Sequence, residues 1–432
     1  MKQKCFYIKS MGCKSNQFEG EIIKENLARH GFCEVKDIHD AEYYILNSCS
    51  VTHKSDNEAL YTLRNVRRLV PEIKTVITGC VAQLEKQNLE KSDYIDFVFG
   101  NDDKFNIGEL LDSDIHSKVS DIMQVEKFNY QTVFDTSKTR YSLKIQDGCN
   151  NRCSYCIIPF ARGKSRSANP EFIIEQINNA AKTGFNEVVL TGIHIGQWGV
   201  DFGTNFVELI RLIEEKTDIP RYRIGSLNPL EINNELLDIL EHSQKFCPHF
   251  HLSLQSACDK TLKSMNRFYT VEKYMEQIDD INRRFNNPFI GCDIITGFVG
   301  ESEQDFEITV KNLKESGLSK IHTFPYSVRK GTFAEKMSGH LSDKVKQERA
   351  DIVKEISVQK FEEFARKNIG TVQEVLIEKR PDKRTGMLKG VSGNYLNVRF
   401  DSENSESGMK FNTLVKAEIL RFDGSYFYGR KI

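Results

Sequence analysis

The chain lacks long hydrophobic runs and carries no excess of charge of either sign. No stretch approaches the ~18 consecutive apolar residues of a membrane-spanning helix. The N-terminal MKQKCFYIKSMGCKSNQ reaches charged and amide residues too early for a signal peptide. Lys and Arg number 60 against 61 Asp and Glu, a formal net charge of -1, so any basic surface has to be local. These absences predict a cytoplasmic protein with no membrane partner.

The chain contains 11 cysteines. Because the number is odd, the chain is long and an export signal is lacking, a disulfide framework is not expected. Metal ligation or catalysis is therefore the leading interpretation of the cysteines.

The 432 residues correspond to about three domains of ~150 residues each. Residues 1–112 alternate β-branched or aromatic runs with amphipathic stretches, which predicts an N-terminal α/β domain with a parallel sheet. Residues 113–137 lack periodicity and are expected to be a linker. Residues 138–368 contain six predicted strands separated by helices, too few for an eight-stranded barrel, so we expect a partial (β/α)6 barrel. Residues 369–432 have short strands and turn residues, which predict a small all-β barrel.

Three cysteines lie on one short segment, DGCNNRCSYCIIPF, directly after a predicted strand. Cys149, Cys153 and Cys156 have C-x3-C-x2-C spacing. Three thiolates can hold three irons of a [4Fe-4S] cluster and leave the fourth iron open for a substrate or cofactor, since an electron-transfer cluster takes four cysteines. The alternative is a structural zinc site. Such a site requires four ligands, and no further His or Cys follows at ordinary spacing.

A second set of cysteines follows the predicted strands of the first domain. Cys13, Cys49 and Cys80 each fall immediately after a strand, and open α/β sheets build their sites at that edge. The three thiols are predicted to ligate a second cluster with an open iron. The alternative is that they are small buried residues. The remaining cysteines show no common placement and are assigned to packing: Cys5, Cys33, Cys247, Cys258 and Cys292.

The segment CNNRCSYC resembles the CxxxCxxC loop of the radical S-adenosylmethionine enzymes. The resemblance implies a barrel, an open-iron cluster and reductive cleavage of S-adenosylmethionine. It also implies that Tyr155 packs beside the adenine of that cofactor. TGIHIG stands where the family has a glycine-containing turn that binds the methionine amine, so Thr191, Gly192 and His194 are candidate cofactor contacts. The segment lacks the GGE motif that is common at this turn. The alternative for His194 is an ordinary loop histidine.

The whole chain resembles the methylthiotransferase family of radical enzymes. Similar segments occur in the same order: MGCKSNQFEGE, LNSCSVT, TGCVAQ, HLSLQSACDKTLKSMNR, DIITGFVGESEQDF and FPYSVRKGTFA. The resemblance implies two [4Fe-4S] clusters and two molecules of S-adenosyl-L-methionine, one for the methyl group and one for the radical. It also implies a sulfur source and an electron donor such as a flavodoxin or ferredoxin. Gln255, Asp293 and Glu301, at or beyond predicted strand ends, are candidate cofactor contacts, with loop or helix-cap hydrogen bonding as the alternative.

The C-terminal segment resembles the TRAM domain, an RNA-binding module. From Ile369 to Ile432, 11 Lys and Arg stand against 8 Asp and Glu, a net +3. From Lys138 to Pro170 the net charge is +6. Both stretches are expected to bind a single-stranded RNA loop with a splayed base. The alternatives are a solvated barrel surface for the C-terminal segment and a salt-bridged helix face for the stretch from Lys138 to Pro170. The predicted RNA contacts are Arg162, Lys164, Arg166, Arg380, Lys383 and Arg384.

Three substrate classes are familiar in this family: isopentenyladenosine in tRNA, threonylcarbamoyladenosine in tRNA, and an aspartate of a ribosomal protein. CSYCIIPFARGKSRS, TGIHIGQWG and RYRIGSLNP look most similar to the threonylcarbamoyl type. The resemblance thus implies methylthiolation of carbon 2 of N6-threonylcarbamoyladenosine in the tRNA anticodon loop. A non-catalytic iron-sulfur RNA-binding regulator is the alternative outside the family, and it would not make 5'-deoxyadenosine.

Overall fold

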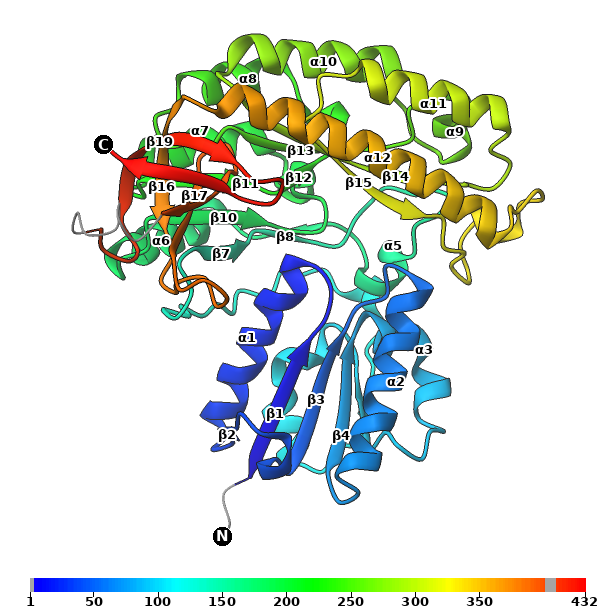
Figure 1. Cartoon of the computed structure of the whole chain (residues 1–432). Helices are drawn as coiled ribbons and strands as arrows, with labels where there is room; N and C mark the ends of the chain where they lie inside the picture. The colour runs from blue at the N-terminus through cyan, green and yellow to red at the C-terminus, as the bar shows by residue number, and fades with distance from the viewer. Residues whose placement is uncertain (1–3, 401–408) are drawn as a thin grey trace.

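The structure, a computed structural model, describes residues 4–400 and 409–432. It contains a parallel α/β sheet, a curved parallel sheet system covered by helices, and a closed β-barrel (Figure 1). The α/β class and the three kinds of architecture predicted from the sequence are confirmed. Within the described residues, the helices lack the combination of length and apolar character that crossing a bilayer requires.

The N-terminal sheet is parallel and has the order β2-β1-β3-β4-β5-β6. Its strands are β1 (Cys5–Ser10), β2 (Cys33–Glu34), β3 (Tyr43–Ser48), β4 (Lys74–Gly79), β5 (Phe97–Phe99) and β6 (Ser117–Lys118). Its helices are α1 (Lys14–Arg29), α2 (His53–Leu69), α3 (Cys80–Leu89) and α4 (Ile107–Asp112). The segment 113–137, expected to be a linker, supplies β6, which pairs with β5. The chain passes from β1 to β2 on one side and then to β3 on the other, so the strand order reverses at β1, which is where such sheets form a crevice.

The middle of the chain forms the partial barrel from two parallel sheets, β11-β10-β7 and β12-β13-β14-β15. The strands are β7 (Tyr141–Lys144), β10 (Glu187–Thr191), β11 (Arg221–Ile224), β12 (Ser226–Leu227), β13 (His249–Gln255), β14 (Phe289–Thr296) and β15 (Lys320–Pro325). The covering helices are α6 (Pro170–Lys182), α7 (Phe206–Lys216), α8 (Asn234–His242), α9 (Asp259–Ser264), α10 (Val271–Arg284) and α11 (Glu303–Glu315). Because β11 and β12 continue one another around Gly225, the six predicted strand units are all present.

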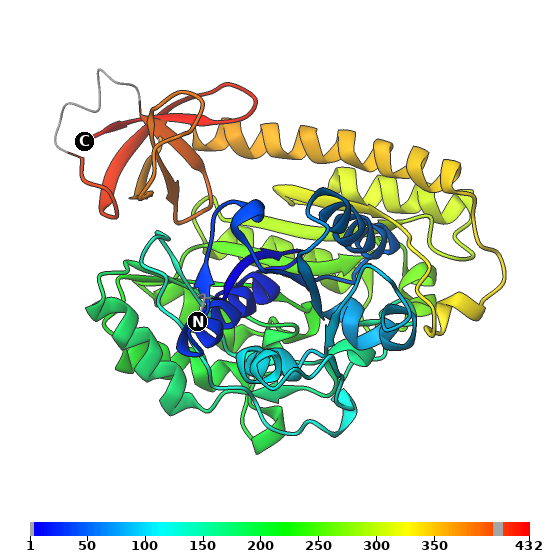
Figure 2. The ribbon, with the colours of Figure 1, turned by 90° about the horizontal axis from the view of Figure 1, so that it is seen from below.

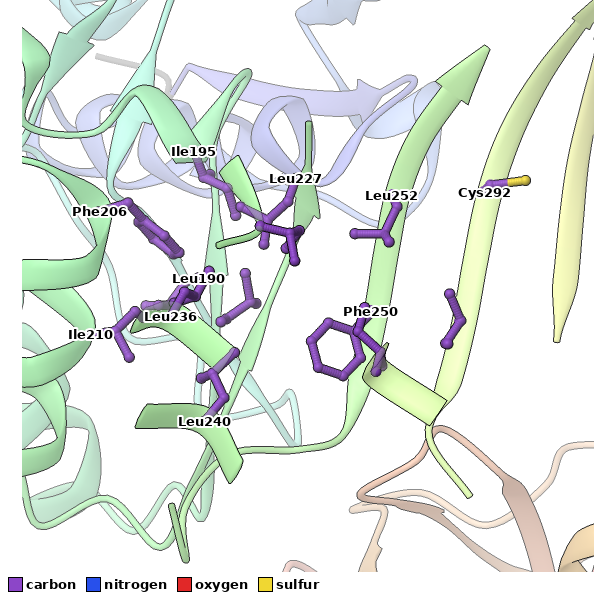
Figure 3. Packing of buried hydrophobic residues seen from close by; sticks show 14 of the residues in the cluster. Leu190, Ile195, Phe206, Ile210, Leu227, Leu236, Leu240, Phe250, Leu252 and Cys292 are labelled. Carbon is purple, nitrogen blue, oxygen red and sulfur yellow. The ribbon is translucent and has the colours of Figure 1, made fainter. Parts of the chain in front are cut away.

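The core of the barrel lies between the strands and the helices. Figure 3 shows Leu190 of β10 facing Phe206 and Leu236 of the covering helices. Cys292 on β14 belongs to the same core and is fully buried, and Cys247 and Cys258 are also buried. The packing role predicted for these three cysteines is confirmed.

The packing role predicted for Cys5 and Cys33 is wrong, because the two residues form a disulfide. They are direct partners in the parallel register of β1 and β2, with their Cα atoms 4.6 Å apart. This pairing depends on the strand register, which the spacing of the two cysteines along the chain does not reveal.

The C-terminal barrel is closed, with strand order β16-β17-β18-β20-β19. Its strands are β16 (Val372–Ile377), β17 (Leu388–Ser392), β18 (Asn397–Phe400), β19 (Leu414–Phe422) and β20 (Phe427–Lys431). The long helix α12 (Asp343–Asn368) packs on β14 and β15 and leads into β16 (Figure 2).

This small barrel covers the amino-terminal ends of the central strands. Arg221 donates to the Val391 carbonyl at 2.8 Å, and Arg223 donates to the Gly393 carbonyl at 2.8 Å. The Tyr395 ring lies 4.8 Å from the Arg223 guanidinium carbon. The C-terminal barrel therefore closes the floor of the central barrel, and the opposite, carboxyl-terminal end faces the N-terminal domain.

Candidate active site

The three N-terminal cysteines meet at the carboxyl ends of neighbouring strands. Cys13 lies three residues after the end of β1, Cys49 follows β3 directly, and Cys80 follows β4 directly. Gly12 has φ +84°, and a Cβ atom there would lie 2.4 Å from the Cys49 Sγ, so glycine allows the first two loops to touch. Cys13 is exposed, whereas Cys49 and Cys80 are buried. The common edge predicted for these thiols is present.

The second set of cysteines lies on the loop between β8 (Gln146–Asp147) and α5 (Ile158–Arg162). Gly148 has φ +70° and a Cβ atom there would lie 1.9 Å from the Lys164 carbonyl oxygen, so only glycine fits at the start of the loop. His194 Nδ1 is 3.4 Å from Cys149 Sγ, and Arg267 Nη1 is 3.7 Å from Cys153 Sγ. Two of the three thiols of this loop thus have a nitrogen group beside them.

Burial, together with a neighbouring thiol, opposes the ionisation of one cysteine in each set. Burial, followed by the nearby Cys80 thiol, raises the pKa of Cys49 to about 11. Burial, followed by the nearby Cys153 thiol, raises the pKa of Cys156 to about 12. A cationic group bound among the thiolates would offset both effects, since thiolate is the ligand form. The two donor sets therefore fit metal clusters.

The spacing of these thiols does not suit one metal ion. Throughout residues 4–400 and 409–432, no three His, Cys, Asp or Glu side chains are arranged to hold a metal ion. Structural zinc draws four such ligands to within about 2.0–2.3 Å of one centre. A [4Fe-4S] cluster is larger, and each cysteine binds its own iron. Two sets of three thiolates consequently fit clusters with an open iron better than zinc.

A cavity of about 140 Å³ adjoins the barrel cysteines. The predicted residues Tyr155, His194 and Gln255 line it. Thr191 and Gly192 do not line it: they belong to the end of β10 and the following turn, where Gln146 Oε1 accepts the backbone N–H groups of residues 193 and 194. The sequence analysis missed eight lining residues: Asn151, Ile158, Ile193, Ser226, Leu227, Asn228, Ser253 and Arg267. Asn228 and Ser253 lie near strand ends, where the active-site residues of such barrels cluster, so the sequence could have indicated both.

A second cavity, of about 230 Å³, lies between the two cysteine loops. Val51 and Thr52, which follow Cys49, form one side of it. The central barrel forms the rest, with Cys156, Gln255 and Asp293 among the lining residues. Gln255 has φ +71°, a costly conformation for a residue with a side chain, beside a register shift in β13.

Glu301 does not reach either cavity. Its carboxylate accepts a hydrogen bond from Arg349 at 2.6 Å and one from the Gly297 N–H at 2.8 Å. Arg349 belongs to α12, so Glu301 attaches that helix to the loop after β14. The prediction that Glu301 contacts the cofactor is wrong, because its carboxylate is buried and bound to Arg349. Arg349 lies 48 residues further along the chain, so the local sequence did not reveal this pairing.

A buried ionic network joins the N-terminal domain to the central barrel. The Glu19 carboxylate of α1 accepts from Arg162 Nη1 at 2.7 Å, and Lys104 and Lys144 also pair with it. Asp147 pairs with Lys144 at 2.7 Å, with Arg162 at 3.1 Å and with Arg166 at 3.5 Å. We call these six residues the Glu19 network.

The network corrects the prediction that Arg162 and Arg166 contact RNA. Both side chains are buried and paired, so neither is available to a phosphate. The partner Glu19 lies 143 residues before Arg162, which is why the stretch from Lys138 to Pro170 looked unpaired in the sequence. Lys164 is exposed on the surface.

The charges of the network also reach the N-terminal cysteines. Burial opposes the charge on Arg162, but Glu19, Cys80 and Asp147 together raise its pKa well above the usual value. Asn101 Nδ2 bridges the Cys80 Sγ at 3.7 Å and the Ala161 carbonyl at 2.7 Å. The helix that follows the barrel cysteines is therefore connected through Asn101 to a cysteine of the other set.

A basic cleft of about 490 Å³ opens where all three parts of the chain meet. Seven cations line it, from α1, from the start of the central barrel and from the C-terminal barrel: Lys14, Lys138, Arg140, Lys379, Arg380, Lys383 and Lys389. Glu378 is the one acidic residue among its lining residues. Two of the predicted RNA contacts, Arg380 and Lys383, thus lie in a shared basic cleft, and Arg384 is exposed on the same turn.

The partial barrel with its cysteine loop at the strand ends defines a radical S-adenosylmethionine fold. The Radical SAM superfamily model matches residues 143–313, and the model described as uncharacterized protein family UPF0004 matches residues 5–100. Among solved structures, the fold is similar to the radical S-adenosylmethionine methyltransferase TsrM of Kitasatospora setae, with a TM-score of 0.56 and 12% identity over 75% of each chain.

Relatives identify the family. The threonylcarbamoyladenosine tRNA methylthiotransferase of Aquifex aeolicus is 37% identical over 85% of this chain and 91% of its own length. The Bacillus subtilis protein with the same designation is 33% identical over 98% and 95%. The tRNA-2-methylthio-N(6)-dimethylallyladenosine synthase of Thermodesulfovibrio yellowstonii is 34% identical over 89% and 90%. The chain belongs to the radical S-adenosylmethionine tRNA methylthiotransferase family, and it is an enzyme of this type.

Proposed function

We propose that this enzyme methylthiolates carbon 2 of N6-threonylcarbamoyladenosine in the anticodon loop of tRNA. The observation that carries the proposal is the 230 Å³ cavity, because it separates two sets of three thiols. One set would serve the radical cofactor and the other the sulfur donor, and the target base would lie between them. The designations of the Aquifex and Bacillus relatives support the same substrate.

The barrel cysteines hold a cluster that supplies the electron for cleavage of S-adenosylmethionine. The chain would orient that cofactor in the 140 Å³ cavity, which Tyr155, His194 and Arg267 line. Cys13, Cys49 and Cys80 would hold the second cluster, and the Glu19 network would keep the two loops in fixed relation. The charged groups of the network are buried and paired with one another, so the network would support the two loops rigidly.

The basic cleft binds phosphates of the tRNA. Its seven cations lie on three separate parts of the chain, which suits an extended anion such as an RNA backbone. The reaction also needs an electron donor, such as a flavodoxin or ferredoxin, and a sulfur source. We place the activity in the cytoplasm, where its tRNA substrate occurs.

The test starts with anaerobic reconstitution and counting of iron and sulfide, with two [4Fe-4S] clusters per chain expected. The enzyme is then incubated with S-adenosylmethionine and tRNA that carries either threonylcarbamoyladenosine or isopentenyladenosine, and the nucleosides are analysed by mass spectrometry. A methylthio product from the threonylcarbamoyl tRNA is expected in competition. A preference for the isopentenyl tRNA would instead match the Thermodesulfovibrio relative, and an absence of 5'-deoxyadenosine would favour a regulator.

A further inference from the structure

A pocket of about 390 Å³ opens from the barrel cysteines to the surface of the molecule. We call it the outer pocket. It shares Cys153, His194 and Arg267 with the 140 Å³ cavity. Its other lining residues include five that are exposed: Asn150, Arg152, Leu230, Asn266 and Phe268. A cysteine that would bind iron therefore lines a pocket that reaches solvent.

The walls of the outer pocket are joined to the cysteine loop. Asn266 Nδ2 donates to the Arg152 carbonyl at 2.8 Å, which connects the loop after α9 to the cysteine loop. Arg267 Nη2 donates to the Ser253 carbonyl at 2.7 Å, and its Nη1 lies 3.7 Å from Cys153 Sγ. The surface around the pocket is thus held in a fixed position relative to the cysteine.

Two large apolar side chains on this pocket are exposed. Phe268 is 79% exposed and Leu230 is 58% exposed, and both line the pocket. Single exposed apolar residues are ordinary on protein surfaces, but here two of them line one opening beside a cluster cysteine. Apolar and aromatic side chains with polar groups around them are typical of protein–protein interfaces. The composition therefore favours a folded protein partner.

The charged side chains of the outer pocket favour an acidic partner. Arg152 and Arg267 line it, and among its described lining residues the one acid, Glu231, is paired with His194. Complementary charge guides the encounter of two proteins and fixes their orientation. An RNA backbone needs more cations than two arginines, and the basic cleft already offers seven.

We infer that the outer pocket is the docking surface for the electron carrier, a small protein with an acidic surface, and that Phe268 and Arg152 contact it. The inference rests on the proposed function, because reductive cleavage of S-adenosylmethionine takes one electron from the barrel cluster. The carrier loses that electron and the cluster gains it, and no bond forms or breaks in the transfer. Redox partners associate through small interfaces, which the surface around one pocket can supply.

The test uses the reconstituted enzyme and a flavodoxin under anaerobic conditions. The dissociation constant of their complex is measured by biolayer interferometry at low and high salt. Formation of 5'-deoxyadenosine is measured with reduced flavodoxin and, separately, with dithionite, a small reductant that needs no docking surface. The wild type should bind flavodoxin, and the affinity should fall as the salt concentration rises.

Phe268→Ser and Arg152→Glu should each raise the dissociation constant about fivefold or more, since aromatic and arginine side chains carry much of the binding energy of interfaces. Formation of 5'-deoxyadenosine with flavodoxin should fall, whereas formation with dithionite should remain at the wild-type level. The matched controls are Tyr61→Ser on α2 and Arg283→Glu on α10, which replace exposed side chains outside the pocket. Both should bind flavodoxin within about twofold of the wild type.

The two reductants separate docking from support of the cluster. An equal loss of 5'-deoxyadenosine with flavodoxin and dithionite would mean that Phe268 and Arg152 support the cluster, and it would overturn the inference. Unchanged flavodoxin binding in both variants would also overturn it, as would weaker tRNA binding with flavodoxin binding intact. The proposed function fails by a different result, namely that the wild type with dithionite makes no methylthio product from threonylcarbamoyl tRNA.

Discussion

At the scale of single residues, the availability of a charge depends on its partners. Lys138 and Arg140 each pair with an acid, Glu21 and Glu187, but stay partly exposed in the basic cleft. Arg162 and Arg166 are instead buried with their acidic partners. The sequence correctly predicted that Cys13, Cys49 and Cys80 lie at one edge of the sheet, because parallel strands bring their carboxyl ends to the same edge. It did not predict the Glu19 network, because the pairing partners are distant in the chain.

The barrel cysteines give the first prediction. Cys149→Ala, Cys153→Ala or Cys156→Ala should abolish cleavage of S-adenosylmethionine, because loss of one thiolate destroys the cluster that supplies the electron. The measurement is 5'-deoxyadenosine formed under anaerobic reducing conditions. Cys258→Ala, a buried cysteine outside both sets, is the control. Normal 5'-deoxyadenosine production by a variant of the barrel loop would contradict the radical assignment.

The N-terminal cysteines should behave differently. Cys13→Ala, Cys49→Ala or Cys80→Ala should spare the formation of 5'-deoxyadenosine and stop methylthio transfer, since the sulfur-bearing site alone is lost. The two products are measured in the same reaction by mass spectrometry. Continued methylthio transfer by these variants would mean that the three thiols are only structural.

The Glu19 network predicts a large effect on stability. Arg162→Met should lower the free energy of unfolding by about 3–5 kcal/mol, because it leaves a buried carboxylate without its bidentate partner. Urea denaturation measures the change. Lys164→Met is the matched control, since Lys164 is exposed two residues away and its replacement should cost little. Equal midpoints for the two variants would show that the network does not stabilise the fold.

At the scale of elements, strands were predicted more reliably than the loops that follow them. The alternation of apolar and polar residues indicated all six strand units of the barrel, but not the shift in β13 that gives Gln255 its positive φ. Nor did it indicate the neighbouring register of β1 and β2 that pairs Cys5 with Cys33. These features arise from contacts between elements, which a local pattern does not contain.

The close contact between two cysteine loops gives an element-scale prediction. Gly12→Ala should displace the loop of Cys13, because the new Cβ would overlap the Cys49 side chain. We expect loss of about half of the bound iron, from the N-terminal cluster, with the barrel cluster retained. Gly31→Ala is the control: its φ is also positive, but no atom lies within 4 Å of the added Cβ. Full iron content in Gly12→Ala would contradict the geometry of this site.

At the scale of the whole molecule, the basic cleft exists only because three parts of the chain come together. The net charge of -1 does not indicate it, but the two locally basic stretches, Lys138 to Pro170 and Ile369 to Ile432, supply six of its seven cations. Deleting the C-terminal barrel would be a poor test of RNA binding, because Arg221 and Arg223 would lose the carbonyl partners that satisfy them. Removal of single cations is a cleaner approach.

Lys383→Ala and Lys389→Ala should each weaken tRNA binding and reduce its dependence on salt. If each lysine neutralises one phosphate, the slope of log affinity against log salt should fall by about 0.7 per variant. Lys344→Ala, at an exposed position on α12 outside the cleft, is the control. Slopes equal to that of the wild type would place the RNA elsewhere.

The docking of the C-terminal barrel on the central strands affects the order in which the parts of the protein assemble during synthesis. The hydrogen bond between Arg223 and the Gly393 carbonyl joins residues 170 positions apart. At about 5–20 residues per second, a ribosome needs roughly 8 to 34 s to synthesise the intervening chain. During that interval the floor of the central barrel is open, although all six cluster cysteines have already been translated. Closure of the floor is therefore a late event in biogenesis, and the iron-binding loops emerge into the cell on a barrel that is not yet complete.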